Sequence, residues 1–129
     1  MREILFRGKD LATGEWVYGD LYHRGTEVVI TSFYCGHHIA VDPATVGQFT
    51  GLLDKNGKRI FEGDIVTYCW YEVETMNFCV DFVSGDFLAV PIKKLDDVWA
   101  IRISGTNKKM EIIGNIHDNQ ELLEVTPDV

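Results

Sequence analysis

The sequence has no long hydrophobic run, and its number of cysteines is odd. The first absence argues against a membrane protein, and the second argues against a protein built on paired disulfides. No window approaches the run of about 20 apolar residues that a helix needs to cross a bilayer, and the first seven residues contain no apolar signal-peptide core. Cys35, Cys69 and Cys79 are odd in number and far apart, which argues against a disulfide framework. We therefore expect a cytoplasmic protein with free thiols and no membrane contact.

Positive charge is also scarce. The chain has 12 basic and 20 acidic residues, which gives a net charge of −8. Residues 1–66 carry 7 basic and 9 acidic groups, whereas residues 67–129 carry 5 and 11. Because nucleic-acid binding depends on neutralising phosphates with Lys and Arg, this balance disfavours a general DNA or RNA binder, although it allows a local basic patch.

The motifs of common enzyme classes are missing as well. There is no P-loop, no G-x-G-x-x-G pattern and no G-x-S-x-G turn around a nucleophilic serine. The carboxylates lie in or beside turns, where such groups cap backbone amides or stay solvated. We expect no enzymatic activity and no cofactor.

Short runs of β-branched and aromatic residues are present instead, separated by turn signals. Hydrophobic residues make up 46% of the 129, enough for one folded domain, and no long amphipathic helix pattern occurs. We expect a mostly β fold, a small antiparallel β-barrel or sandwich of SH3-like character with about eight or more strands. The chain is predicted to form a single domain over residues 1–129, with two fused β subdomains, about 1–60 and 61–117, as the alternative.

Two turns support this prediction. Asn56-Gly57 predicts a hairpin, because both residues tolerate the positive φ of a type I′ turn. Ser84-Gly85-Asp86 predicts a second hairpin between two β-type runs.

Two short helical segments are also expected. Asp42-Pro43 predicts a turn or a single helical turn with Pro43 at its first position. Asp118 and Glu121 have the spacing of a capping box, which predicts a short C-terminal helix over residues 118–124.

One cluster has the chemistry of zinc ligands, namely Cys35, His37 and His38. A closed site would need a fourth ligand, and the candidates elsewhere in the chain are Cys69, Cys79, His23 and His117. No CxxC or HxxxH pair is present, so we favour a loop with a buried cysteine and solvated histidines. The three residues are weak metal candidates, and we expect no metal.

A second cluster could form an interaction surface at the predicted hairpin, and it comprises Lys55, Asn56, Lys58 and Arg59. Together with Arg2, Arg7 and Lys9 these cations could form a basic edge, with Trp16, Tyr18 and Phe61 as stacking faces for nucleic acid. We favour a solvated hairpin tip and aromatic residues in the core, because large aromatic residues in strands usually pack inward.

Three segments in order resemble the YopX family of phage and prophage proteins: FRGKDLATGEWVYGDL, VDPATVGQFTGLLDKNGKRIFEGDIV and IIGNIHDNQELL. The chain departs from the family at Phe61, where Tyr is frequent, and at Gln120, where Pro is frequent. The resemblance implies a mostly β fold and an origin in a phage or prophage, so the cytoplasm expected above is that of a host bacterial cell. It implies no activity and no catalytic residue.

These observations lead to two functional hypotheses. The first is an accessory protein of unknown biochemical role that contacts an unknown host or phage protein, or associates with itself through exposed strand edges. The second is a nucleic-acid-binding β-barrel module that uses the hairpin from Lys55 to Arg59.

Overall fold

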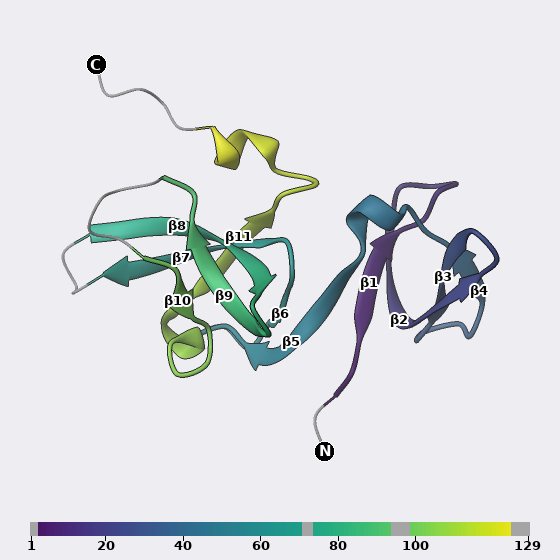
Figure 1. Ribbon diagram of the computed structural model, residues 1–129, viewed down its shortest axis with the longest axis horizontal. Coiled ribbons are helices and arrows are strands. Elements are labelled where there is room, and N and C mark those ends of the chain that lie inside the picture. The colour runs from purple at the N-terminus through teal and green to yellow at the C-terminus, as the bar shows by residue number, and fades with distance from the viewer. Residues whose placement is uncertain (1–2, 71–73, 94–98, 125–129) are drawn as a thin grey trace. The chain divides into compact units, whose positions relative to one another are not determined.

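The computed structural model describes residues 3–70, 74–93 and 99–124, and this part of the chain is mostly β, as predicted (Figure 1). It contains eleven strands and three short 3-10 turns. The strands are β1 (Phe6–Lys9), β2 (Trp16–Arg24), β3 (Glu27–Ser32), β4 (His38–Ala40), β5 (Gly47–Leu53), β6 (Arg59–Phe61), β7 (Asp64–Trp70), β8 (Glu74–Val83), β9 (Asp86–Pro91), β10 (Ile101–Arg102) and β11 (Glu111–Asn115). The 3-10 turns are η1 (Pro43–Thr45), η2 (Asn107–Lys109) and η3 (Gln120–Leu123). No helix among these residues is long and apolar enough to span a membrane.

The strands form two antiparallel sheets. The first has the order β4-β3-β2-β1-β5-β6 and the second the order β10-β9-β8-β7-β11. Neither sheet closes into a barrel within the described ranges, so the barrel alternative of the predicted barrel or sandwich is wrong. A bridge between Asp10 and Val41 joins the end of β1 to the end of β4. It curls the first sheet but does not supply the ladder of bonds that a barrel needs.

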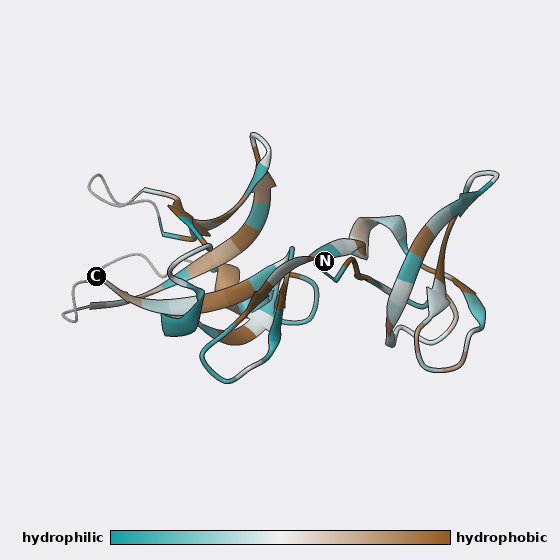
Figure 2. Ribbon diagram, turned by 90° about the horizontal axis from the view of Figure 1, so that it is seen from below, coloured by the Kyte–Doolittle hydropathy of each residue, from teal (hydrophilic) through white to brown (hydrophobic). Residues whose placement is uncertain are grey.

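Contacts between Cα atoms divide the chain into a first unit, residues 1–51, and a second unit, residues 52–129, with the boundary inside β5. The core of the first unit contains the buried side chains of Val17, Ile30 and Val41. From Trp16 to Leu21 in β2 the residues alternate between less and more buried positions, as the two-residue period of a strand predicts. Figure 2 shows the hydropathy of the residues as brown apolar and teal polar bands along the strands.

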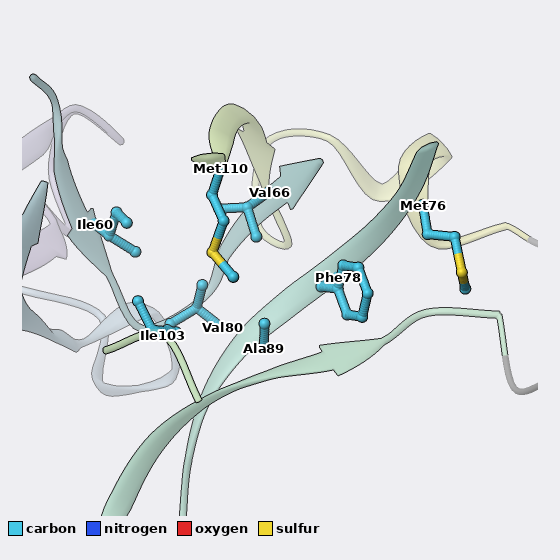
Figure 3. Close-up of a cluster of buried hydrophobic side chains, with 8 residues drawn as sticks. All are labelled: Ile60, Val66, Met76, Phe78, Val80, Ala89, Ile103 and Met110. Atoms are coloured by element: carbon cyan, nitrogen blue, oxygen red, sulfur yellow. The ribbon is translucent and has the colours of Figure 1, made fainter. Parts of the chain in front are cut away.

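The second unit has its own core. Figure 3 shows the buried side chains of this core, which come from β6, β7, β8 and β9 and from the chain on either side of η2. Phe78 in β8 is fully buried, and its ring lies 6.3 Å from the ring of Tyr68 in β7. Burial of a side chain of this size stabilises the fold by about 1.5–3 kcal/mol. The other buried members are Ile60, Val66, Met76, Val80, Ala89, Ile103 and Met110.

Gly19 permits a close approach of strands in the first sheet. It pairs with Phe6 on one side and with Ser32 on the other. A Cβ atom at this position would lie 1.8 Å from the backbone oxygen of Thr31, far inside van der Waals contact. The central position of β2 therefore requires glycine for steric reasons.

Both predicted hairpins are present, but their turns differ. Ser84 and Gly85 have φ angles of 51° and 85°, and they connect the paired residues Val83 and Asp86. Positive φ at both positions makes this a two-residue type I′ turn.

The turn between β5 and β6 is of another type, so the predicted type I′ geometry at Asn56-Gly57 is wrong. Gly57 has a φ of 79°, whereas Asn56 is not among the residues with positive φ. Gly57 N donates to Asp54 O at 3.0 Å, and Asp54 N donates to Lys58 O at 2.8 Å. This is the longer hairpin loop in which a type I turn is followed by a left-handed glycine.

The Asp42-Pro43 prediction is confirmed. The 3-10 turn η1 begins at Pro43, and the Asp42 side chain accepts a hydrogen bond from Ala44 N at 3.0 Å.

The predicted C-terminal helix over residues 118–124 is not found, because this stretch holds only the 3-10 turn η3. The 3-10 turn η3 has Asn119 at its N-cap position, and no side-chain hydrogen bond caps it. The Asn115 side chain accepts from His117 N and Asp118 N, and the Asn119 side chain accepts from Asn115 N. Asp118 does not cap a helix and instead accepts from the Asn115 side chain at 3.1 Å.

Candidate interaction surfaces

A buried carboxylate organises the hairpin that the sequence analysis selected. Asp54 is only 4% exposed, and its Oδ1 accepts hydrogen bonds from Asn56 N at 2.8 Å and from Lys58 N at 2.9 Å. Its Oδ2 accepts from Ile112 N in β11 at 3.0 Å. One side chain thus fixes the loop and connects it to a strand 58 residues away in sequence.

The same three bonds determine the charge state of Asp54. Burial alone would raise the pKa of this carboxyl, because it disfavours the charged form. The backbone amides of Ile112, Lys58 and Asn56 stabilise the carboxylate more strongly, and Lys58 adds a favourable charge. The net result is a pKa below the ordinary value for aspartate, so Asp54 is an anion at neutral pH.

The predicted basic surface has less positive charge than the sequence suggested, because Glu111 lies beside it. Lys55 Nζ lies 3.3 Å from Glu111 Oε2, and the side-chain amide of Asn56 donates to Glu111 Oε1 at 3.4 Å. Lys58 and Arg59 are exposed beside them. The glutamate compensates one of the three cations of this hairpin, which lowers its attraction for phosphate.

The other proposed members of this surface have different positions. Phe61 is buried and offers no stacking face, and Arg2 lies outside the described residues. Arg7 is also buried, and its Cζ lies 4.6 Å from the centre of the Trp16 ring. Lys9 Nζ lies 5.4 Å from the same ring. Trp16 therefore packs with cations of its own sheet.

Another surface lies in the loop between β3 and β4. We call residues Phe33–Gly36 of this loop the aromatic turn. Ser32 organises it: its Oγ accepts from Tyr34 N at 3.3 Å and from Cys35 N at 3.4 Å, and its backbone oxygen accepts from Gly36 N at 2.9 Å. Phe33 N donates to Tyr18 O at 2.8 Å. The turn is thus held by hydrogen bonds to β2 and to the end of β3.

Two large aromatic side chains project from this turn into solvent. Phe33 is 77% exposed and Tyr34 is 85% exposed. Their rings lie 6.1 Å apart in an edge-to-face arrangement. Exposed apolar side chains are ordinary when isolated, but two adjacent aromatic residues on an ordered turn are typical of a protein contact.

The weak zinc candidates lie in and beside the aromatic turn. Cys35 is exposed, not buried as the sequence suggested, and the Ser32 hydroxyl and the His37 backbone amide lower its pKa below the ordinary value for a thiol. His38 Nδ1 lies 2.9 Å from Thr31 Oγ1. Among the residues that the structure describes, no group of three or more His, Cys, Asp or Glu side chains is arranged to hold a metal ion.

The remaining ligand candidates are dispersed over several elements. His23 belongs to β2, Cys69 to β7 and Cys79 to β8, and His117 follows β11. Burial is the main cause that raises the pKa of Cys79 to about 11, which keeps its thiol protonated.

Sequence reasoning missed Phe33 and Tyr34, although a signal was available. Residues 28–41 contain no Asp, Glu, Lys or Arg, and this is the longest such run in the chain. This uncharged stretch carries the exposed Phe33 and Tyr34.

Comparisons with known proteins agree with this architecture. The family model described as YopX protein matches residues 5–124. A solved structure, the crystal structure of protein EF1440 from Enterococcus faecalis, is similar over 96% of this chain and 100% of that one, with 28% identity and a TM-score of 0.56. A comparison with curated proteins finds no match.

Proposed function

Since the chain belongs to the YopX family, we propose that it is a phage or prophage accessory protein that acts by protein–protein contact, with a host or phage protein or with a second copy of itself, and catalyses no reaction itself. The observation that supports this proposal is the aromatic turn. Aromatic residues are over-represented among the residues that contribute most to protein–protein binding. Phe33 and Tyr34 expose most of their surface, and the turn that carries them is already ordered by Ser32.

The charge of the protein supports the same proposal. A net charge of −8 repels nucleic acid and other acidic surfaces, which weakens binding to them. The aromatic turn contains no charged side chain, so a partner can cover it without burying an unpaired charge.

A comparative pull-down from host lysate tests the proposal. Wild-type protein and a variant with Phe33→Ser and Tyr34→Ser serve as baits, with Trp99→Ser as the control, because Trp99 is 74% exposed and lies in the second unit. We expect proteins captured by the wild type and the Trp99 variant to be absent from the double variant. Identical captured sets for all three baits would contradict a role of the turn in binding a host protein.

Nucleic-acid binding by the hairpin is the second candidate, and the exposed cations Lys58 and Arg59 support it. Anisotropy titrations of labelled single-stranded and double-stranded DNA at about 50 and 200 mM salt test this function, since phosphate contacts weaken steeply with salt. If neither DNA binds at the lower salt concentration, the hairpin does not act by binding nucleic acid.

A further inference from the structure

We propose that the aromatic turn and strand β4 form the contact between two copies of this chain. This inference rests on the proposed function, because it names the partner of the same surface. It follows from two independent properties of residues 28–41, which are their lack of charge and the position of β4 in its sheet.

The first property is electrostatic. Two copies that each carry a net charge of −8 repel one another over most of their surfaces. The run from Val28 to Val41 carries no formally charged side chain, and it includes the exposed Phe33 and Tyr34. Here two copies can approach without placing like charges opposite each other, and here apolar area is available to bury.

The second property concerns strand edges. Natural sheets protect their edge strands with charged side chains, because an uncharged edge can pair with another chain. Of the four strands at the ends of the two sheet orders, β6 contains Arg59, β10 contains Arg102 and β11 contains Glu111. Strand β4 contains only His38, Ile39 and Ala40. It is the one edge without a Lys, Arg, Asp or Glu in the described part of the chain.

The hydrogen bonds of β4 show which of its groups face outward. His37 O accepts from Ser32 N, and Val41 N donates to Val28 O. The backbone N–H and C=O groups of the odd-numbered residues therefore point toward β3. The backbone groups of His38 and Ala40 point to the opposite side, where Ala40 O already accepts from Leu11 N at 3.1 Å. The free edge is therefore short and centred on His38, next to the aromatic turn.

A two-fold axis fits this arrangement. Antiparallel pairing of β4 with its own copy places each aromatic turn against the other copy, and a two-fold interface uses the same patch on both partners. The short edge sets the register, and the exposed Phe33 and Tyr34 rings supply apolar area that the second copy can bury. A short strand alone would give few bonds, so the aromatic residues determine the affinity.

The test is the oligomeric state of the full chain. Light scattering after size exclusion, from about 1 to 200 µM, should show a shift from one chain to two in the wild type. Tyr34→Asp places a carboxylate on each side of the axis and should weaken dimerisation at least 10-fold, since an aromatic residue at the centre of an interface contributes at least this factor. Tyr34→Phe should dimerise nearly as well as the wild type.

Controls separate this interface from others. Trp99→Asp introduces the same charge at a position that is 74% exposed in the second unit, and it should leave the dimer unchanged. Far-UV circular dichroism confirms that the variants fold. Phe33→Ser gives a second probe of the turn without added charge, and it should also weaken the dimer.

Three outcomes would overturn the inference: a single chain at 200 µM, a dimer that Tyr34→Asp leaves intact, or a dimer that Trp99→Asp disrupts equally. If the wild type is a single chain yet captures a different protein through Phe33 and Tyr34, the inference fails while the proposed function stands. A dimer that depends on Tyr34 supports the inference whatever the lysate yields.

Discussion

Replacement of Asp54 by Asn should destabilise the protein by about 2–4 kcal/mol at neutral pH. In the wild type one carboxylate oxygen accepts hydrogen bonds from Asn56 N and Lys58 N, and the other accepts from Ile112 N. The variant can keep its carbonyl oxygen toward the first two amides. Its NH2 group then faces Ile112 N–H, so two donors oppose each other in a site that is almost fully buried.

The magnitude follows from these bonds. A hydrogen bond to a charged group contributes about 1.5–3 kcal/mol, and the loss of charge weakens the two remaining bonds as well. Total stabilities of small domains are about 5–15 kcal/mol, so the loss is large. Asp86→Asn is the matched control: Asp86 pairs with Arg102 at 2.8 Å on the surface, and such exposed pairs contribute less than about 1 kcal/mol.

Urea denaturation followed by circular dichroism measures the effect, and its pH dependence tests the cause. The pKa of Asp54 is lowered in the folded state, so its stabilisation is present above the ordinary value near 4 and disappears as pH falls through the lower folded value. The difference between wild type and Asp54→Asn should thus be constant from pH 5 to 8 and shrink below about pH 4. A difference under about 0.5 kcal/mol at pH 7, or one that grows toward acid pH, would refute the reasoning.

Three further predictions follow from local geometry. Gly19→Ala should destabilise the first unit by more than about 3 kcal/mol in thermal denaturation, because its Cβ would lie 1.8 Å from Thr31 O; a melting temperature equal to wild type would contradict this. Ser84→Asn should stabilise the hairpin by roughly 0.5 kcal/mol in urea denaturation, because asparagine adopts the φ of 51° more readily; a loss of stability would count against it. Cys35 should react first with a disulfide reagent at pH 8 and Cys79 last, which peptide mapping checks; early labelling of Cys79 would contradict its partial burial and its pKa of about 11.

Local signals in the sequence predicted the elements that local geometry determines. The type I′ turn at Ser84-Gly85 and the 3-10 turn after Asp42 depend on residues within the turn itself. The loop around Asn56 depends also on the bond from Asp54 to Ile112, 58 residues away, so its turn type could not be read from the Asn-Gly pair. The prediction of the C-terminal helix failed for a local reason, because Asp118 accepts from the Asn115 side chain and no side chain caps the turn η3.

The candidate surface was harder to predict than the fold. Phe33 and Tyr34 follow a β-rich run, and aromatic residues in such a position are usually buried. Their exposure results from the way in which Ser32 turns the chain, which depends on bonds to Tyr34 N and Cys35 N. The lysines of the hairpin were visible in the sequence, but the pairing of Lys55 with Glu111 across 56 positions was not.

The strand order of the two sheets also has a consequence for synthesis on the ribosome. In the first sheet, β1 to β4 pair with their neighbours in sequence, so these hairpins can form as soon as they emerge. In the second sheet, β7 pairs with β11, which is synthesised only after β8, β9 and β10. One edge of β7 therefore stays unpaired until β11 has been synthesised. Until then β8 is the only strand that pairs with β7, and the open edge of an apolar strand can aggregate.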